Sequence, residues 1–275
     1  MEPLPMPLKE VDRVEILTLM DNFVDVLLEN TAVVKRPPKA IGEEIPTDTL
    51  LAEHGLCLLV KVQQGAEKHT IMLDTGYNSM SVLHNMDILA VDPNELEAIV
   101  LSHAHMDHTG ALHAILGKIS KPIPLVVHPD AFLYPRFLEE KDGSKKRFPR
   151  TLVRNDFKQR NVKIHESKAP TSILDGAILV TGEVERTTAF EKGMPGALVE
   201  RDGSLEPDPI KDDQSLVINL KEKGLVIITG CSHAGIVNTI LYAKKLTGIE
   251  KVYAVLGGFH LSGAFFEKIL EKTID

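Results

Sequence analysis

The chain has 275 residues, of which 43% are hydrophobic and 25% are charged, as in ordinary globular proteins. Its net charge of −8 argues against a general nucleic-acid binder, and no apolar run of about 18 residues predicts a membrane span. The first residues, "MEPLPMPLKE", lack the basic and apolar regions of a secretory signal, and two cysteines make no disulfide framework. These features favour a reducing, cytoplasmic setting.

Hydrophobic patterning predicts the elements of the first part of the chain. We expect a strand over 14–19, a Pro-rich loop over 35–48, two hairpin strands around "QQGAE" (63–67), and a helix over 78–89. The stretch "LEAIVLS" (96–102) is a short, continuous apolar run. Such a run is typical of a strand that is buried on both faces.

The second part alternates between strands and helices. Helices are expected over 106–119, 234–248 and 264–272, and strands over 123–129, 161–166, 176–184, 214–221, 224–230 and 251–261. Early hairpins followed by strand–helix alternation indicate an α/β fold with a mixed sheet. Between the predicted strands 123–129 and 161–166, residues 141–160 contain eight Lys or Arg against two Asp. This basic stretch belongs to an insertion predicted at about 130–162.

Four side chains that can bind metal follow the predicted buried strand. They lie in "SHAHMDHTG" (102–110) and are His103, His105, Asp107 and His108. Binding sites in α/β folds gather at the carboxyl ends of strands. Imidazole and carboxylate groups suit zinc, and also iron or manganese. We therefore predict two adjacent divalent metal ions that share one loop.

This stretch resembles the signature of the metallo-β-lactamase-fold superfamily of metal-dependent hydrolases, and the resemblance runs from about Val14 to the end of the chain. It implies a four-layer αβ/βα sandwich of two mixed β-sheets flanked by helices, in one domain over 1–275. The metals would lie at one edge, between the sheets. "IMLDTG" resembles the superfamily's second-strand motif, which implies that Asp74 supports the metal loop. The alternative is an aspartate that only initiates a turn.

Further ligands are expected at distant strand ends. His233 in "VIITGCSHAG" and His260 in "VYAVLGGFHL" each follow a predicted strand, and two glycines before His260 permit a close backbone approach. Cys231 stands where many superfamily members have a bridging aspartate, so it is either a thiolate ligand or an inert buried cysteine. Glu183, in "VTGEVERTT", stands where relatives have a histidine. We favour His233 for that role and keep Glu183 as the alternative.

The expected arrangement follows from these candidates. One ion is held by His103, His105 and His233, and the other by Asp107, His108 and His260. Bound metal lowers the pKa of water from about 15.7 to about 7, which gives a nucleophile at neutral pH. Asp107 and His233 are the expected catalytic residues. Zinc is the metal that we expect at this site. The remaining histidines are expected to be ordinary surface or core residues.

Three segments point to one branch of the superfamily. "TGCSHAGIVNT", "GGFHL" and "TGEVERTTAFE" resemble the branch named after 7,8-dihydropterin-6-methyl-4-(β-D-ribofuranosyl)-aminobenzene-5'-phosphate synthase. The resemblance implies a small, phosphorylated substrate and leaves hydrolase and synthase or transferase chemistry open. That branch usually continues past the last helix with a strand ending in His-Cys-Thr-Gly. This chain ends at "EKTID", which leaves an edge strand and one more ligand open.

The basic stretch has two interpretations. Lys145, Lys146, Arg147 and Arg150 either bind substrate phosphates as part of a lid, or they belong to a solvated surface insertion. Two other functions are also compatible with the fold: a non-catalytic ligand-binding or sensor protein, and a di-iron redox protein. Neither nucleic acid nor a membrane is expected as a partner, and the sequence leaves the oligomeric state open.

Overall fold

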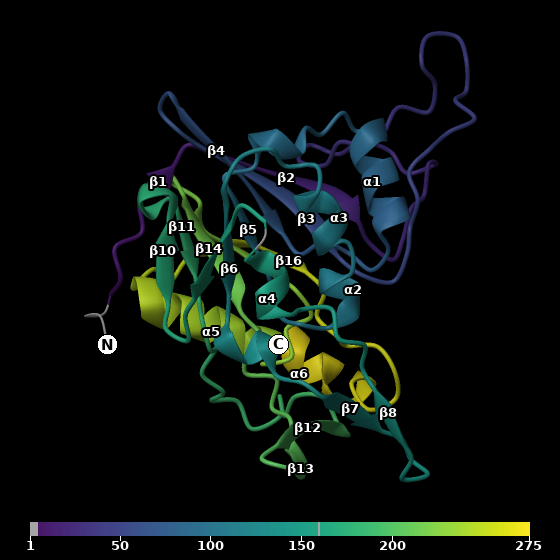
Figure 1. Ribbon diagram of the computed structural model, residues 1–275. Helices are drawn as coiled ribbons and strands as arrows, with labels where there is room; N and C mark the ends of the chain where they lie inside the picture. Colours follow the sequence, from purple (N-terminus) through teal and green to yellow (C-terminus); the bar gives the residue numbers. More distant parts are fainter. Residues whose placement is uncertain (1–4, 159) are drawn as a thin grey trace.

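The structure is a computed structural model that describes residues 5–158 and 160–275 (Figure 1). Two six-stranded sheets and one four-stranded sheet make up its β-structure. None of the helices in these two ranges is long and apolar enough to cross a bilayer.

The first six-stranded sheet is mixed. Its strand order is β2 (Arg13–Met20), β3 (Cys57–Gln64), β4 (Glu67–Leu73), β5 (Ala98–Val100), β6 (Ile123–Val127) and β9 (Val162–Glu166). The pairs β2–β3 and β3–β4 are antiparallel, which confirms the hairpin expected around "QQGAE". The pairs β4–β5, β5–β6 and β6–β9 are parallel. The carboxyl ends of β4 and β5 therefore lie side by side.

The second six-stranded sheet is also mixed. Its order is β10 (Thr171–Ile173), β11 (Ile178–Val180), β14 (Ser215–Leu220), β15 (Gly224–Thr229) and β16 (Val252–Gly257), and β1 (Glu10–Val11) pairs with β14. Strands β14 and β15 are antiparallel, whereas β15 and β16 are parallel and are joined by the helix α5 (Ile236–Thr247).

Helices cover the outer faces of both sheets. The helix α1 (Ser79–Ile88) begins at Asn78, whose side chain accepts a hydrogen bond from the Met80 amide. It packs on the first sheet with α3 (Leu112–Leu116), whereas α5 packs on the second. The other short helices are α2 (Met106–Thr109), α4 (Arg154–Phe157), α6 (Leu270–Ile274), η1 (Pro93–Glu95), η2 (Pro129–Phe132), η3 (Leu174–Gly176) and η4 (Glu267–Ile269).

Three apolar clusters hold these layers together. One joins the two sheets face to face, with Val60 and Ile71 from the first sheet and Leu216 and Ile228 from the second. The other two fill the space between each sheet and its helices. The result is the expected four-layer αβ/βα sandwich, because each sheet buries both of its faces.

The four-stranded sheet was not predicted. Its order is β13 (Ser204–Pro207), β12 (Ala197–Arg201), β7 (Arg136–Glu139) and β8 (Lys145–Arg147). Its strands are short, and β7 and β8, which lie within the predicted basic insertion, form a hairpin. Because β7 pairs with β12 from a distant segment, no local pattern announced this sheet.

The helix expected over 106–119 is also interrupted. It is divided at Gly110 and Ala111 into α2 and α3. Gly110 packs directly on the backbone of Tyr77, where a Cβ atom would lie 1.9 Å from the carbonyl oxygen. The interruption therefore comes from a close tertiary contact beside the site. The last predicted helix, expected over 264–272, begins later, with η4 at Glu267, and continues as α6.

Gly257 offers a test of how tightly the strand ends are packed. It has a φ of 129°, and a Cβ atom would lie 2.0 Å from the Thr229 carbonyl oxygen. Gly257→Ala should therefore lower the free energy of unfolding by about 3 kcal/mol, at the upper end for overpacking. The matched change is Gly143→Ala, where φ is 80° and no atom lies within 4 Å. It should cost only about 1 kcal/mol of backbone strain. Equal costs in urea denaturation would contradict this account.

Candidate metal centre

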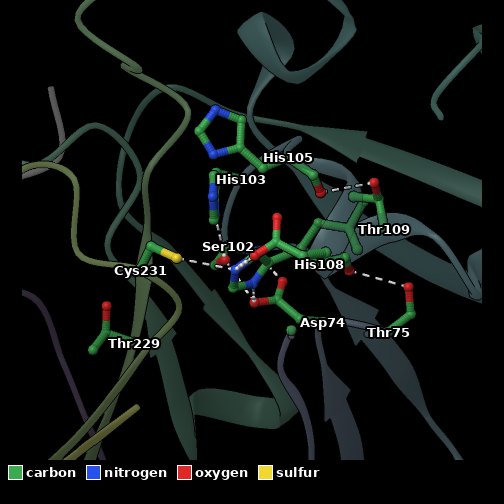
Figure 2. Close-up of polar contacts among 12 residues, drawn as sticks. Asp74, Thr75, Ser102, His103, His105, His108, Thr109, Thr229 and Cys231 are labelled. Carbon is green, nitrogen blue, oxygen red and sulfur yellow. Dashed lines mark hydrogen bonds and ion pairs between the residues drawn. The ribbon is translucent and has the colours of Figure 1, made fainter. Parts of the chain in front are cut away.

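The loop between β5 and α2 carries His103 and His105 of the "SHAHMDHTG" motif, and α2 itself carries His108. His103 and His108 are buried within the protein, and His105 is almost fully buried. Figure 2 shows the three rings gathered near Cys231, which follows β15 in the other sheet. The loop thus lies at the edge where the two large sheets meet.

Asp74, directly after β4, supports this loop. Its carboxylate accepts hydrogen bonds from the Ser102 backbone amide (2.7 Å), from the Ser102 hydroxyl (2.6 Å) and from Nδ1 of His108 (2.6 Å) (Figure 2). The Ser102 hydroxyl oxygen in turn accepts from Nδ1 of His103 at 2.9 Å. This network assigns the proton of both rings to Nδ1 and orients each Nε2 away from Asp74.

Six side chains form three overlapping groups that could each hold a metal ion. Within a group, the candidate ligand atoms all lie within 4.8 Å of one another. The groups are His103, His105 and His233; His103, His108 and Cys231; and Cys231, His233 and His260. Because neighbouring groups share members, the six side chains form one continuous centre.

Two nitrogens in this centre are buried without a partner. Within residues 5–158 and 160–275, Nε2 of His103 and Nε2 of His233 have no hydrogen-bond partner. Burial, followed by the neighbouring imidazoles, lowers the pKa of both rings well below the usual value. Both rings are therefore neutral and present lone pairs, as a metal ligand must. A buried polar atom without a partner is costly, so these residues fit a metal such as zinc.

His108 contacts both Asp107 and Cys231. Nε2 of His108 is 3.1 Å from the Cys231 sulfur and 3.3 Å from the Asp107 carboxylate. Burial opposes ionisation of Asp107, but the hydrogen bond and charge of His108 lower its pKa to about 2. Asp107 is therefore a carboxylate at neutral pH, ready to bind a cation.

Comparisons with known proteins identify the family of the chain. The profile described as "Metallo-beta-lactamase superfamily" matches residues 52–182. The chain is 36% identical over 222 residues to 7,8-dihydropterin-6-methyl-4-(beta-D-ribofuranosyl)-aminobenzene-5'-phosphate synthase of Methanocaldococcus jannaschii. That alignment covers 80% of this chain and 74% of the synthase. The chain belongs to the metallo-β-lactamase superfamily.

Two other superfamily relatives extend the similarity. An uncharacterized protein of Methanocaldococcus jannaschii is 31% identical over 256 residues, which is 92% of this chain and 84% of that protein. The crystal structure of Tm1679, titled a metal-dependent hydrolase of the β-lactamase superfamily, superposes with a TM-score of 0.67. It is 24% identical and covers 95% of this chain and 82% of its own. This structural likeness shows the shared fold.

The structure brings together some of the expected ligands of the superfamily site more closely than others. His103, His105 and His233, expected around one ion, form one of the three groups. The set expected around the second ion is split: His260 groups with Cys231 and His233, whereas Asp107 contacts His108 but belongs to none of the groups.

Glu183 and the cations of the insertion lie outside these groups. The Glu183 carboxylate is 3.1 Å from Nζ of Lys211 and is in none of them. Lys145, Lys146 and Arg147 are exposed on β8. Arg150 is also exposed, with its guanidinium over the Tyr134 ring at 5.0 Å.

Several neighbours of the site were not anticipated from the sequence. His54 was expected to be an ordinary surface residue, yet its Nε2 lies 3.4 Å from the Asp107 carboxylate. Phe148, which follows β8, stacks on the His105 ring with centroids 4.9 Å apart and planes at 17°. The segment after β8 therefore places one aromatic ring beside the candidate centre. Neither contact has a local sequence signal.

A buried ion pair joins the same insertion to the metal loop. The Asp212 carboxylate accepts a hydrogen bond from the Ala104 amide (2.9 Å) and pairs with the Arg136 guanidinium (2.6 Å). Arg136 is also paired with Asp208 at 2.9 Å. The only hint in the sequence was the acidic pair in "KDDQS" before a predicted strand. Arg136 and Asp212 together hold the backbone between His103 and His105.

Removal of the buried guanidinium should be costly. Arg136→Met leaves Asp208 and Asp212 buried without their counter-ion, so the free energy of unfolding should fall by about 3–5 kcal/mol. Arg154→Met is the control, because its pair with Glu166 is partly exposed, and it should cost less than about 1 kcal/mol. Urea denaturation of both variants measures the difference. A similar cost in both would show that Arg136 is no more important than a surface residue.

The metal-free protein should lose stability in acid through His105. Burial lowers its pKa from 6.5 to about 4. Between these pH values the unfolded chain binds more protons, so the stability present above pH 6.5 is lost as the pH falls toward 4. His105→Gln should reduce the slope of unfolding free energy against pH by up to about 1.4 kcal/mol per pH unit. Urea titrations with a chelator present test this. An unchanged slope would rule out the assignment.

Proposed function

We propose that this protein is an enzyme that holds two divalent metal ions and acts on a phosphate or diphosphate group of a small-molecule substrate. Zinc is the metal that we expect. The observation that carries the proposal is the pair of buried, unpartnered nitrogens on His103 and His233, within reach of His105. Two neutral imidazoles that face one another without a shared proton are best explained by a cation between them.

The ligands divide between two ions. His103, His105 and His233 hold one ion, and His108 and His260 hold the other. Cys231 belongs to two of the three groups and would supply a thiolate ligand. Asp107, 3.3 Å from Nε2 of His108, supplies the remaining charged ligand. Imidazole, thiolate and carboxylate ligands are those that zinc accepts.

The chemistry follows from this ligand set. Divalent ions, when bound, lower the pKa of water to about 7 and neutralise charge on phosphate oxygens. Asp74 keeps the rings of His103 and His108 oriented, directly or through Ser102. Asp107 remains ionised and lies 3.4 Å from the exposed ring of His54.

Two observations favour a phosphorylated substrate. Strand β8 exposes Lys145, Lys146 and Arg147, and Phe148, the residue after that strand, stacks on His105. Exposed cations on a segment that reaches the centre would attract phosphate oxygens. The 36% identical relative is named as the synthase of a phosphorylated compound, which favours group transfer beside hydrolysis for the reaction of this chain.

Metal content is the first test. The purified protein, reloaded with zinc and dialysed, should contain about two ions per chain, as expected for a dinuclear site. His103→Ala and His233→Ala should each lose at least one ion, because they remove ligands of the first ion. His165→Ala, on the exposed end of β9, is the matched control and should keep both ions. Elemental analysis measures the result. Full occupancy in both ligand variants would defeat the proposal.

Turnover of bis-p-nitrophenyl phosphate then tests catalysis. Activity should disappear on chelation, return with added metal and be absent from His103→Ala. A metal-replete protein without turnover across a panel of phosphate esters would favour the ligand-binding alternative. Strong visible absorbance of the purified protein would favour the di-iron alternative, because zinc is colourless.

A further inference from the structure

Residues 212–214, an Asp-Asp-Gln sequence, lie directly before β14 and are all buried. Ser215, the first residue of β14, pairs with Thr229, the last residue of β15. The 212–214 segment therefore lies beside the loop after β15, which carries His233. Buried polar side chains need hydrogen-bond partners, and this segment finds several of them on the two loops that carry candidate metal ligands.

The side chains of this segment point to opposite faces of the second sheet. Within β14, Leu216 and Ile218 face the first sheet, whereas Val217 faces the side that α5 covers. Side chains alternate along a strand, so the same alternation directs Gln214 toward the first sheet and Asp213 toward the amino end of α5. The segment can therefore reach a loop of each sheet at the same time.

On one face, the segment holds the loop after β5. The Gln214 backbone amide donates to the Ser102 carbonyl oxygen at 2.9 Å, and the Gln214 side-chain amide donates to the Leu101 carbonyl oxygen at 2.8 Å. Asp212 adds the hydrogen bond from the Ala104 amide at 2.9 Å. These three bonds fix the backbone on both sides of the first histidine of the metal loop.

On the other face, Asp213 holds the loop after β15. Its Oδ2 accepts a hydrogen bond at 2.9 Å from the backbone amide of Ala234, the residue after His233. Its Oδ1 is buried and has no hydrogen-bond partner within residues 5–158 and 160–275. Such an oxygen costs stability, about 1–3 kcal/mol. Local features that cost stability are expected at functional sites, where the position of a neighbouring group matters more.

We propose that residues 212–214 position the ligands of the first ion by fixing the distance between His103 and His233. The inference rests on the proposed function and names residues that determine how tightly the metal is held. Their hydrogen bonds reach backbone atoms next to the two histidines rather than the imidazole rings, so they act through the ligands. Zinc needs its ligands in a tetrahedral arrangement, and a shift of one loop against the other would move His233 out of it.

Zinc affinity of the full-length chain, measured by competition with a colorimetric chelator, tests the inference. Asp213→Ala should weaken zinc binding about 10- to 100-fold, the usual effect of losing a group that orients a metal ligand. Asp213→Asn keeps an oxygen for the Ala234 amide and should recover most of the affinity. If Asp213→Ala does not fold, Gln214→Met provides the test from the other face. It removes the bond to Leu101 and should weaken zinc binding about tenfold.

Asn85→Ala is the matched control. Asn85 is also buried, and its side chain makes three hydrogen bonds to the backbone of Leu19 and Leu51, which belong to neither ligand loop. This variant should lose stability in urea and keep the zinc affinity of the wild-type chain. A residue that acts only on stability would behave in the same way.

The outcomes separate the two proposals. If the wild-type chain binds zinc and the variants of Asp213 and Gln214 bind it as tightly, the positioning role is wrong and the metal site stands. The positioning role is also wrong if Asn85→Ala weakens zinc binding as much, or if Asp213→Asn recovers nothing. If the wild-type chain binds no zinc, the proposed function fails and the positioning role fails with it.

Discussion

The candidate centre depends on one buried carboxylate. Asp74 is fully buried and accepts three hydrogen bonds, two from Ser102 and one from His108. A buried charge is tolerated only when it is paired and hydrogen-bonded, so the carboxylate and the metal loop must form together. They can do so because β4 and β5 are parallel neighbours whose ends place Asp74 beside Ser102. The pairing of β4 with β5 thus orients the imidazoles of His103 and His108.

The small third sheet connects the β7–β8 hairpin to the candidate centre. Arg136 on β7 is buried against Asp212, which holds the Ala104 amide, and Phe148 after β8 packs on His105. A change in this hairpin is therefore transmitted to the backbone and the ring that the metal loop presents. Elsewhere around the centre, the segment after β16 contributes Phe266, whose ring lies 4.9 Å from that of His260.

Much of the fold could be predicted because its signals are local. Some features depend only on residues that are adjacent in the sequence. They are the hairpin around Gly65, the Asn78 cap of α1 and the continuous apolar strand before Ser102. The third sheet had no such signal, because its strands are short and pair across distant segments. The break at Gly110 had none either, since it arises from the approach of Tyr77. His54 looked ordinary because its partner, Asp107, lies in another part of the chain.

By itself, the sequence determined which side chains are candidates to bind a metal ion. A run of imidazole and carboxylate groups after a buried strand, with further histidines after two others, indicates metal binding whatever the details of packing. Only the tertiary structure decided which atoms meet: Cys231 with His108, Asp107 with His54, and Phe266 with His260. The physical reason is that ligand type is a property of each side chain. Coordination, burial and the shape of a pocket depend on distances between residues that the chain order does not constrain.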